Sequence, residues 1–246
     1  MKTPVLSIIT VTYNALSDLK KTVASVAEQT YTAIEYIVVD GASTDGTASY
    51  IANNRAVVTH FLSEPDNGLY DAMNKAMRMV TGDYVCFLNA GDTFVDAHLL
   101  TRLCATLPAD LVPDILYGQT QLVDNQGHYI GMRRLSAPNT LTWKSFQQGM
   151  LVCHQSFWVH RDKIVPYDLR YRYSADFDWC IRIMKQSTCM FNTHLTLVSY
   201  LHEGLTTQHH RASLLERFQI MCKHYGCLST CAYHAWFVLR ALLKIN

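Results

Sequence analysis

Three short polar segments hold most of the side chains in this sequence that could bind a ligand. They are residues 12–14, 40–45 and 89–92, and each directly follows an apolar run. Their hydroxyl, amide and carboxylate groups can accept hydrogen bonds from a polar ligand, and carboxylates can also hold a divalent cation. These segments are therefore the first place to expect chemistry.

The apolar runs before these segments predict the strands that would position them. Residues 5–12 are apolar and rich in β-branched side chains, and residues 34–39 are almost continuously apolar, as in a strand covered on both faces. Residues 84–88 predict another buried strand. Because ligands of open α/β sheets bind beyond the carboxyl ends of the strands, we expect the three polar segments to share one crevice.

Helical periodicity between the strands predicts an open α/β sheet in the N-terminal half. Apolar residues recur every three or four positions after residue 15, which indicates a helix from Ser17, its expected N-cap, to about residue 28. A second helix, capped within residues 43–45, is expected to run to about residue 52 and to precede a short strand at 57–62. A third helix is expected from residue 69 to about 80, ended by Gly82.

The second half is less regular. Strands are expected at residues 114–123 and 129–134, joined by a hairpin turn, and again at 155–160. Residues 176–184 predict a helix. We therefore expect one domain over residues 1–210, a mixed sheet flanked by helices, and a helical tail over 211–246.

Composition excludes several classes of function. The 21 Lys and Arg residues nearly balance the 20 Asp and Glu residues, and the net charge of +1 gives no field for holding nucleic acid. Polar residues interrupt the first apolar run, unlike in a signal peptide, so a cytosolic protein is expected. No stretch reaches the roughly 18 apolar residues of a membrane span. The motifs HExxH, GxGxxG, GxSxG and the P-loop are absent, which argues against zinc proteases, NAD enzymes, esterases and NTPases.

The polar segments resemble the successive motifs of the family 2 glycosyltransferases. The similar sequences are SIITVTYN at residues 7–14, VDGASTDGT at 39–47 and EPDNGLYDAMNK at 64–75, and the similarity covers nearly all of residues 5–95. After residue 100 only short patches match. The resemblance implies the GT-A nucleotide-sugar fold and an inverting transfer of a sugar from a nucleoside diphosphate donor to an acceptor hydroxyl.

The resemblance also implies where the donor lies. Asp40, at a strand end, is suited to accept hydrogen bonds from a base N–H, with Thr12 and Tyr13 on the adjoining strand end. Alone, Asp40 and Asp45 would be interpreted as turn residues, and Lys75 is equally compatible with a solvated helix charge. The expected donor-binding residues are Thr12, Tyr13, Asn14, Asp40, Ser43, Asp45, Asp66, Lys75 and Asn89.

Asp92 is the expected ligand of a divalent metal, Mn²⁺ or Mg²⁺, which would stabilise the departing diphosphate as a Lewis acid. The family usually shows Asp-x-Asp at this strand end. Here Asn89 and Gly91 occupy the aligned positions and Asp92 follows, so one carboxylate remains. His202 is a second candidate ligand, although a lone His is more often structural.

The acidic segment at residues 174–179 is similar to the family motif whose carboxylate deprotonates the acceptor hydroxyl. Ala175 replaces the usual Glu and Asp176 keeps the Asp, so Asp176 is the expected general base. Asp178 is the alternative base. Both carboxylates could instead simply begin a helix, where its dipole favours them. The pair His154-Gln155 resembles a short patch near the acceptor side.

Two other functions are also compatible with the sequence. A sugar-phosphate nucleotidyltransferase should carry a Gly-rich, Arg-containing loop after the first strand, where this chain has residues 13–16, Tyr-Asn-Ala-Leu. A non-catalytic nucleotide-sugar-binding subunit would explain why Asn89 and Gly91 stand where carboxylates are usual.

The C-terminal segment suggests how the acceptor is reached. Residues 228–245 predict a helix that is apolar nearly all round, with Trp236 and Phe237 beside Arg240 and Lys244, which suits a helix in the lipid headgroup layer. The alternative is a helix packed on the domain with Trp236 in its core. Similar proteins commonly extend lipid-linked glycans at the inner face of a bacterial membrane. A glycan or lipid-linked glycan acceptor, a role in cell-surface polysaccharide biosynthesis and a peripheral position on that membrane face are therefore expected.

Overall fold

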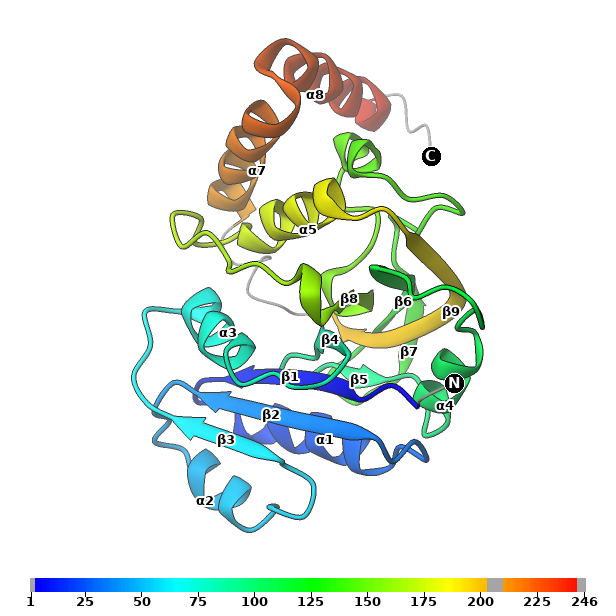
Figure 1. Ribbon diagram of the computed structural model, residues 1–246. Coiled ribbons are helices and arrows are strands. Elements are labelled where there is room, and N and C mark those ends of the chain that lie inside the picture. Colours follow the sequence, from blue (N-terminus) through cyan, green and yellow to red (C-terminus); the bar gives the residue numbers. More distant parts are fainter. Residues whose placement is uncertain (1–2, 203–209, 243–246) are drawn as a thin grey trace.

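A mixed sheet forms the centre of the computed structural model, which describes residues 3–202 and 210–242, and helices cover both faces of the sheet (Figure 1). The strands are β1 (Leu6–Thr12), β2 (Ile34–Asp40), β3 (His60–Ser63), β4 (Tyr84–Phe87), β5 (Thr93–Phe94), β6 (Ile115–Val123), β7 (Tyr129–Met132), β8 (Phe157–His160) and β9 (Met190–Leu201). The α-helices are α1 (Leu16–Ala27), α2 (Thr47–Ala52), α3 (Leu69–Met77), α4 (Leu99–Ala105), α5 (Ala175–Gln186), α7 (His210–Tyr225) and α8 (Cys227–Leu242). Short 3₁₀ helices are η1 (Trp143–Gln148), η2 (His154–Ser156) and η3 (Arg161–Lys163).

The strand order is β3-β2-β1-β4-β8-β6-β9-β5, with β7 paired to β6. Strands β3, β2, β1 and β4 are mutually parallel, as predicted from their apolar runs. Strand β8 pairs antiparallel with both β4 and β6, while β6 pairs parallel with β9. The sheet is thus a parallel N-terminal half joined through β4 and β8 to a mixed second half.

Alternation along the central strands builds two apolar cores. Successive side chains of a strand point to opposite faces, so Ile8 and Val38 pack with α1 on one face while Ile9 and Val39 pack with α3 on the other. All four side chains are essentially buried. Coverage of both faces explains why these strands are continuously apolar in sequence.

Several predicted element ends were wrong. Helix α1 begins at Leu16, and Ser17 is not its N-cap; the Leu16 N–H instead donates to Asp45 Oδ2 at 2.8 Å from the loop after β2. Helix α3 ends at Met77 rather than near residue 80. Gly82 does not end that helix but packs against β1, where an added Cβ would collide with the Ser7 side chain. Contacts distant in sequence set these boundaries.

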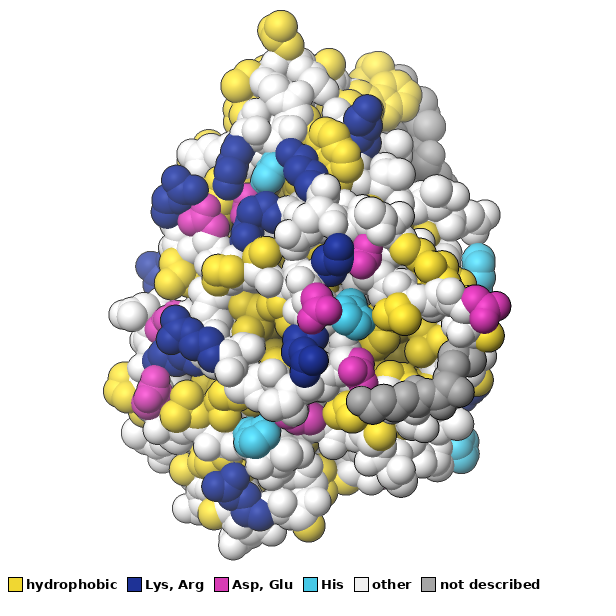
Figure 2. Space-filling model, in the orientation of Figure 1, with side chains coloured by type: hydrophobic (Ala, Val, Ile, Leu, Met, Phe, Trp, Pro, Cys, Tyr) yellow, Lys and Arg dark blue, Asp and Glu magenta, His cyan; other side chains and the backbone are white. Residues whose placement is uncertain are grey.

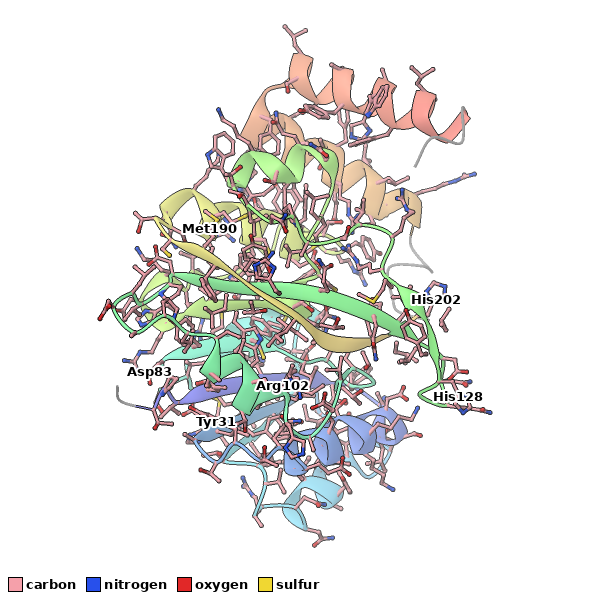
Figure 3. All side chains as sticks on the ribbon, turned by 90° about the vertical axis from the view of Figure 1, so that its right-hand side faces the viewer. Tyr31, Asp83, Arg102, His128, Met190 and His202 are labelled. Carbon is pink, nitrogen blue, oxygen red and sulfur yellow. The ribbon has the colours of Figure 1, made fainter. Side chains whose placement is uncertain are left out.

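Strand β9 was not predicted, although it is the longest strand among the described residues. His194 lies in the left-handed region of backbone conformation, with φ of 56°, and the register against β6 shifts nearby. Such an interruption hides the period-two pattern that identifies a strand. Figure 3 shows Met190 and His202 at the two ends of this strand.

Helix α7 is held on α5 by hydrogen bonds and ion pairs to one buried carboxylate. The carboxylate of Asp178 is fully buried and accepts from Arg182 Nε at 2.6 Å, Lys223 Nζ at 3.0 Å and His224 Nε2 at 2.8 Å. Burial alone would raise the pKa of Asp178, but the hydrogen bonds from His224, Arg182 and Lys223 outweigh it and hold this pKa well below its usual range. Ile220 of α7 also enters the core. The C-terminal helices are therefore confirmed, and the first of them shares the core of the preceding residues.

In the described part of the chain, no helix combines the length and apolarity needed to cross a lipid bilayer.

Removing the buried charge should destabilise the protein strongly. Asp178→Asn removes the carboxylate that pairs with Arg182 and Lys223 and accepts from His224, a loss we expect to lower the free energy of unfolding by about 3–5 kcal/mol in urea titrations at pH 7. Because the folded pKa of Asp178 is depressed, the difference from wild type should shrink as the pH falls below about 4. Asp96→Asn, which removes an exposed ion pair with Arg102, is the matched control and should change stability by less than about 1 kcal/mol. Equal effects of the two substitutions would contradict this account.

Candidate active site

A cavity of about 720 Å³ lies beyond the carboxyl ends of β1 and β4, bounded also by α3, α5 and α7. It is the place where ligands of open α/β sheets bind. Six of the residues predicted from sequence line it: Thr12, Tyr13, Asp66, Asn89, Asp92 and Asp176. The other six do not line it: Asn14, Asp40, Ser43, Asp45, Lys75 and His202. The first and third polar segments thus share one crevice, and the second lies behind it.

Residues of that second segment tie neighbouring loops together. Asp40 is buried and accepts hydrogen bonds from the hydroxyls of Ser43 and Ser63 at 2.5 and 2.6 Å. Asn14 accepts from the Thr44 N–H at 2.8 Å, and its own N–H donates to Ser43 Oγ at 2.7 Å. The loop after β1 is thereby fixed to the loop after β2. These side chains shape the cavity from behind.

A glycine allows the rim of the cavity to close up. An added Cβ at Gly41 would lie 2.6 Å from Asp66 Oδ2 and 3.2 Å from the Tyr13 ring, so only glycine fits without displacement. Tyr13 is 66% exposed and presents its ring at the rim. Lys75 lies behind the rim, where it donates to the Pro65 carbonyl at 2.8 Å and pairs with Glu64 at 2.9 Å. Lys75 thus braces the segment that carries Asp66.

Two buried oxygen atoms of the cavity wall have no hydrogen-bond partner among the described residues. They are Thr12 Oγ1 and Asn89 Oδ1. Leaving a buried polar atom unsatisfied costs about 1–3 kcal/mol. Both atoms are therefore ready to accept hydrogen bonds from, or coordinate, a bound ligand.

Asp92 lies deep in the cavity wall and is held on both carboxylate oxygens. Oδ1 accepts from the Leu201 N–H at 3.0 Å, and Oδ2 accepts from Gln155 Nε2 at 2.9 Å. Burial raises the pKa of Asp92 to about 7; the two hydrogen bonds oppose this rise, and the charge of Asp18 adds to it. A nearby positive charge would favour the ionised form.

The oxygen atoms at this wall suit a divalent cation that comes with a phosphate ligand. Each carboxylate oxygen of Asp92 keeps a lone pair beyond its hydrogen bond, and Asn89 Oδ1 is free. Across residues 3–202 and 210–242, however, no three His, Cys, Asp or Glu side chains gather as a metal cluster. Mg²⁺ is often held by one or two carboxylates together with substrate phosphates, and the residues present fit that arrangement.

His202 is separate from this wall. It is exposed, and its N–H donates to the Val123 carbonyl at 3.1 Å, beside the β6–β7 hairpin. Figure 3 shows His202 on the same side of the molecule as His128, which lies in that hairpin. The neighbouring positions 203–209, and His209 among them, lie outside the described residues.

Asp176 occupies the first turn of α5, and its carboxylate is oriented from two directions. Oδ1 accepts from the Tyr70 hydroxyl at 3.1 Å and from the Phe177 N–H at 2.9 Å. Burial and the neighbouring Asp176 charge raise the pKa of Tyr70 well above its usual value, so Tyr70 stays a donor. Asp178, the alternative base, is fully buried in its ion cluster and does not line the cavity. This geometry favours Asp176.

An aromatic cluster supports the floor beneath Asp176. His154 stacks on Phe87 with centroids 4.9 Å apart, and its Nε2 lies 2.6 Å from the Tyr167 hydroxyl. Burial lowers the pKa of His154 to about 4, partly opposed by Asp176, so the ring is neutral at pH 7. Tyr167 stacks in turn on Trp179. His154 is thus a neutral wall residue, and its neighbour Gln155 holds Asp92.

Two cationic side chains of the cavity were not predicted. Arg133 follows β7, and its Nη1 donates to the Met150 carbonyl at 2.7 Å. Arg217, on α7, lies against the Phe177 ring, and its buried Nε has no hydrogen-bond partner within residues 3–202 and 210–242. Neither residue belongs to a recognisable motif, so only the fold reveals that they line the same cavity as Asp92.

Comparisons with known proteins agree with this architecture. The family model described as Glycosyl transferase family 2 matches residues 7–166. A PGL/p-HBAD biosynthesis glycosyltransferase of Mycobacterium bovis is 32% identical over 211 residues, 83% of this chain and 79% of the relative.

Two solved structures show the same fold. S. aureus TarS 1–349 in complex with UDP-GlcNAc aligns with a TM-score of 0.73 at 14% identity, over 98% of this chain and 76% of that one. The mannosyltransferase PcManGT from Pyrobaculum calidifontis, in complex with GDP-Man and Mn²⁺, aligns with a TM-score of 0.64 at 15% identity, over 99% and 81%.

The buried Asp92 should leave a signature in the pH dependence of stability. Between about pH 4 and 7 the folded protein keeps a proton on Asp92 that the unfolded chain has lost, so raising the pH destabilises wild type by up to about 1.4 kcal/mol per pH unit. Asp92→Asn cannot titrate. Urea unfolding in EDTA at pH 5 and pH 8 should therefore show wild type losing stability relative to the variant at pH 8. A parallel pH dependence of the two proteins would show that Asp92 titrates normally.

Proposed function

Because this chain belongs to glycosyl transferase family 2, and so is a glycosyltransferase, we propose that it transfers a sugar, with inversion, from a nucleoside diphosphate donor to an acceptor hydroxyl. The observation that carries the proposal is that Asp176 shares one cavity with the strand-end residues Thr12, Asn89 and Asp92. Family membership sets aside a nucleotidyltransferase or a non-catalytic binding subunit.

The nucleoside is proposed to lie at the rim formed by Thr12, Tyr13 and Asp66. Support comes from the exposed Tyr13 ring, on which a base can stack, and from the unpartnered Thr12 hydroxyl. Asp40 is buried behind the cavity, and we propose that it shapes the base pocket through its bonds to Ser43 and Ser63 and does not contact the base itself. Two structures with the same fold contain UDP-GlcNAc or GDP-Man.

The remaining donor residues are proposed to act indirectly. Asn14, Ser43 and Asp45 hold the loops that carry the rim, and Lys75 braces the segment before Asp66. Their replacement should therefore weaken donor binding through loop order.

The diphosphate is proposed to lie between Asn89 and Asp92 on one side and Arg217 on the other. A divalent cation bound to Asn89 and Asp92 would supply Lewis-acid stabilisation of the departing diphosphate. Arg217 adds a cation from the chain itself, and its unpartnered Nε supports this role. No observation supports His202 as a metal ligand.

Asp176 is proposed to remove the proton from the attacking hydroxyl. The acceptor oxygen then forms its bond to the anomeric carbon while the bond from that carbon to the diphosphate oxygen breaks, and the electron pair leaves with the diphosphate. Tyr70 and the Phe177 N–H keep the Asp176 carboxylate in place for this transfer. Because the acceptor oxygen attacks opposite the leaving diphosphate in a single displacement, the configuration at the anomeric carbon is inverted.

Replacing the base should separate binding from turnover. Asp176→Asn keeps the shape but cannot accept the proton, so we expect sugar transfer to fall by at least about 100-fold, in the range of general-base contributions. The dissociation constant for UDP or GDP, measured by calorimetry with Mn²⁺, should change less than about threefold. The control is Asp162→Asn, which replaces an exposed carboxylate outside the cavity and should keep full activity. Undiminished transfer by Asp176→Asn would remove Asp176 from the base role.

Helix α8 supports a proposed contact with the membrane. Its inner side chains, Tyr233 and Phe237, pack against the core, while Leu228, Val238 and Trp236 are 91%, 62% and 48% exposed. Trp236 is thus not the core residue that the alternative interpretation required. Figure 2 shows apolar side chains at the top of the molecule with Lys and Arg side chains directly below them. An apolar helix face beside cations suits the surface of an anionic bilayer, where a lipid-linked glycan acceptor would be found.

Charge placed on this face should weaken vesicle binding. Leu228→Glu together with Val238→Glu puts carboxylates where apolar contact with the headgroup layer is proposed, so cosedimentation with phosphatidylglycerol vesicles should drop at least fivefold, while transfer to a water-soluble acceptor is kept. Val112→Glu puts one carboxylate at a 68% exposed apolar position outside α8 and should bind like wild type. Equal vesicle binding by all three proteins would exclude α8 as the membrane contact.

A further inference from the structure

We propose that Glu216, on α7, is a positioning residue for Asp176. This inference rests on the base role proposed above. Glu216 belongs to no motif, lies beyond the residues matched by the family model, and does not line the cavity. Its proposed action is to fix the backbone that leads into Asp176.

The carboxylate of Glu216 accepts hydrogen bonds from three consecutive backbone N–H groups. Oε1 accepts from Arg172 at 2.8 Å, and Oε2 accepts from Tyr173 and Ser174, also at 2.8 Å. These residues directly precede α5, whose first turn carries Asp176. Hydrogen bonds to a charged acceptor are stronger than neutral ones, and three on one carboxylate leave the segment little freedom.

A second contact from α7 fixes the same segment. Ser174, which is buried at the start of α5, places its hydroxyl 2.9 Å from Ser213 Oγ and 3.2 Å from the Ser213 carbonyl. Residues 172–174, which lead into α5, are therefore all anchored by contacts from α7. The position of the Asp176 backbone is determined by a different helix.

This anchoring matters because the base must meet a hydroxyl at hydrogen-bond distance. Tyr70 orients the Asp176 side chain from α3, but Tyr70 cannot set where the first turn of α5 begins. A displacement of about 1 Å at a reacting group can cost about 100-fold in rate. Loss of the Glu216 carboxylate frees the segment before α5 but leaves α7 anchored through Asp178 and Ile220, so catalysis should slow while Arg217 and the donor rim stay in place.

The test compares kcat and the KM for the donor among three full-length proteins, which are the wild type, Glu216→Gln and Glu216→Ala. We expect Glu216→Ala to lower kcat about tenfold to 100-fold with KM for the donor within twofold, and Glu216→Gln to lose less because its amide oxygen still accepts. Hydrogen exchange of the amides of residues 172–174 should accelerate in both variants. Gln219→Ala, at an exposed position on the same helix, should match wild type in every measurement.

The double variant Asp176→Asn/Glu216→Ala distinguishes positioning from a general loss of structure. If Glu216 acts through Asp176, the double variant should transfer no more slowly than Asp176→Asn alone in single-turnover assays with labelled donor. The inference would be overturned if the rate losses of the two single variants multiplied in the double variant. A kcat of Glu216→Ala within twofold of wild type would overturn it as well. Should Glu216→Ala fail to fold, Glu216→Gln carries the same comparison, with thermal unfolding measured alongside.

The two proposals fail in different ways. Persistent transfer by Asp176→Asn would refute the base role itself. An inactive Asp176→Asn combined with normal kcat in both Glu216 variants would leave the base role standing and remove only Glu216.

Discussion

The site depends on how the four-residue strand β4 is paired. β4 has a parallel neighbour, β1, on one side and an antiparallel neighbour, β8, on the other. Parallel pairing with β1 puts the end of β4 beside the end of β1, and the Thr10 hydroxyl extends this contact by donating to the Leu88 carbonyl at 2.6 Å. Antiparallel pairing with β8 brings the residues before β8 to the same edge. Gln155 can therefore reach Asp92, and the two halves of the sheet meet at one cavity.

Three aspartates near this edge have different roles because their surroundings differ. Asp178 is buried among cations and acts as a structural counter-ion between α5 and α7. Asp92 is buried among neutral donors, with a pKa raised to about 7, and so favours an added positive charge. Asp176 is partly accessible, held by Tyr70 and its own helix, and faces the cavity. Only the last arrangement suits repeated proton transfer.

The sequence was sufficient for features that depend on local pattern. Continuous apolar runs identified β1, β2 and β4, and polar residues after β1 and β4 located the cavity wall. It was insufficient where distant parts of the chain decide the outcome. Asp45 supplies an acceptor at the start of α1, and the left-handed His194 hides β9. Asp176 and Asp178 both lie in the first turn of α5, and the sequence does not show that one faces the cavity and the other an ion cluster. The roles proposed for Glu216 and Arg217 likewise depend on the packing of α7 against α5.

The anomeric configuration of the product tests the central claim, a single displacement assisted by Asp176, most directly. Proton NMR of the product formed from an α-linked nucleoside diphosphate sugar measures the coupling between the first two protons of the transferred sugar. A single displacement at the anomeric carbon gives inversion, so a β-linked product is expected from the first turnover onward. An α-linked product would contradict it, because retention requires either two displacements or a route in which Asp176 is not the base that activates the attacking hydroxyl.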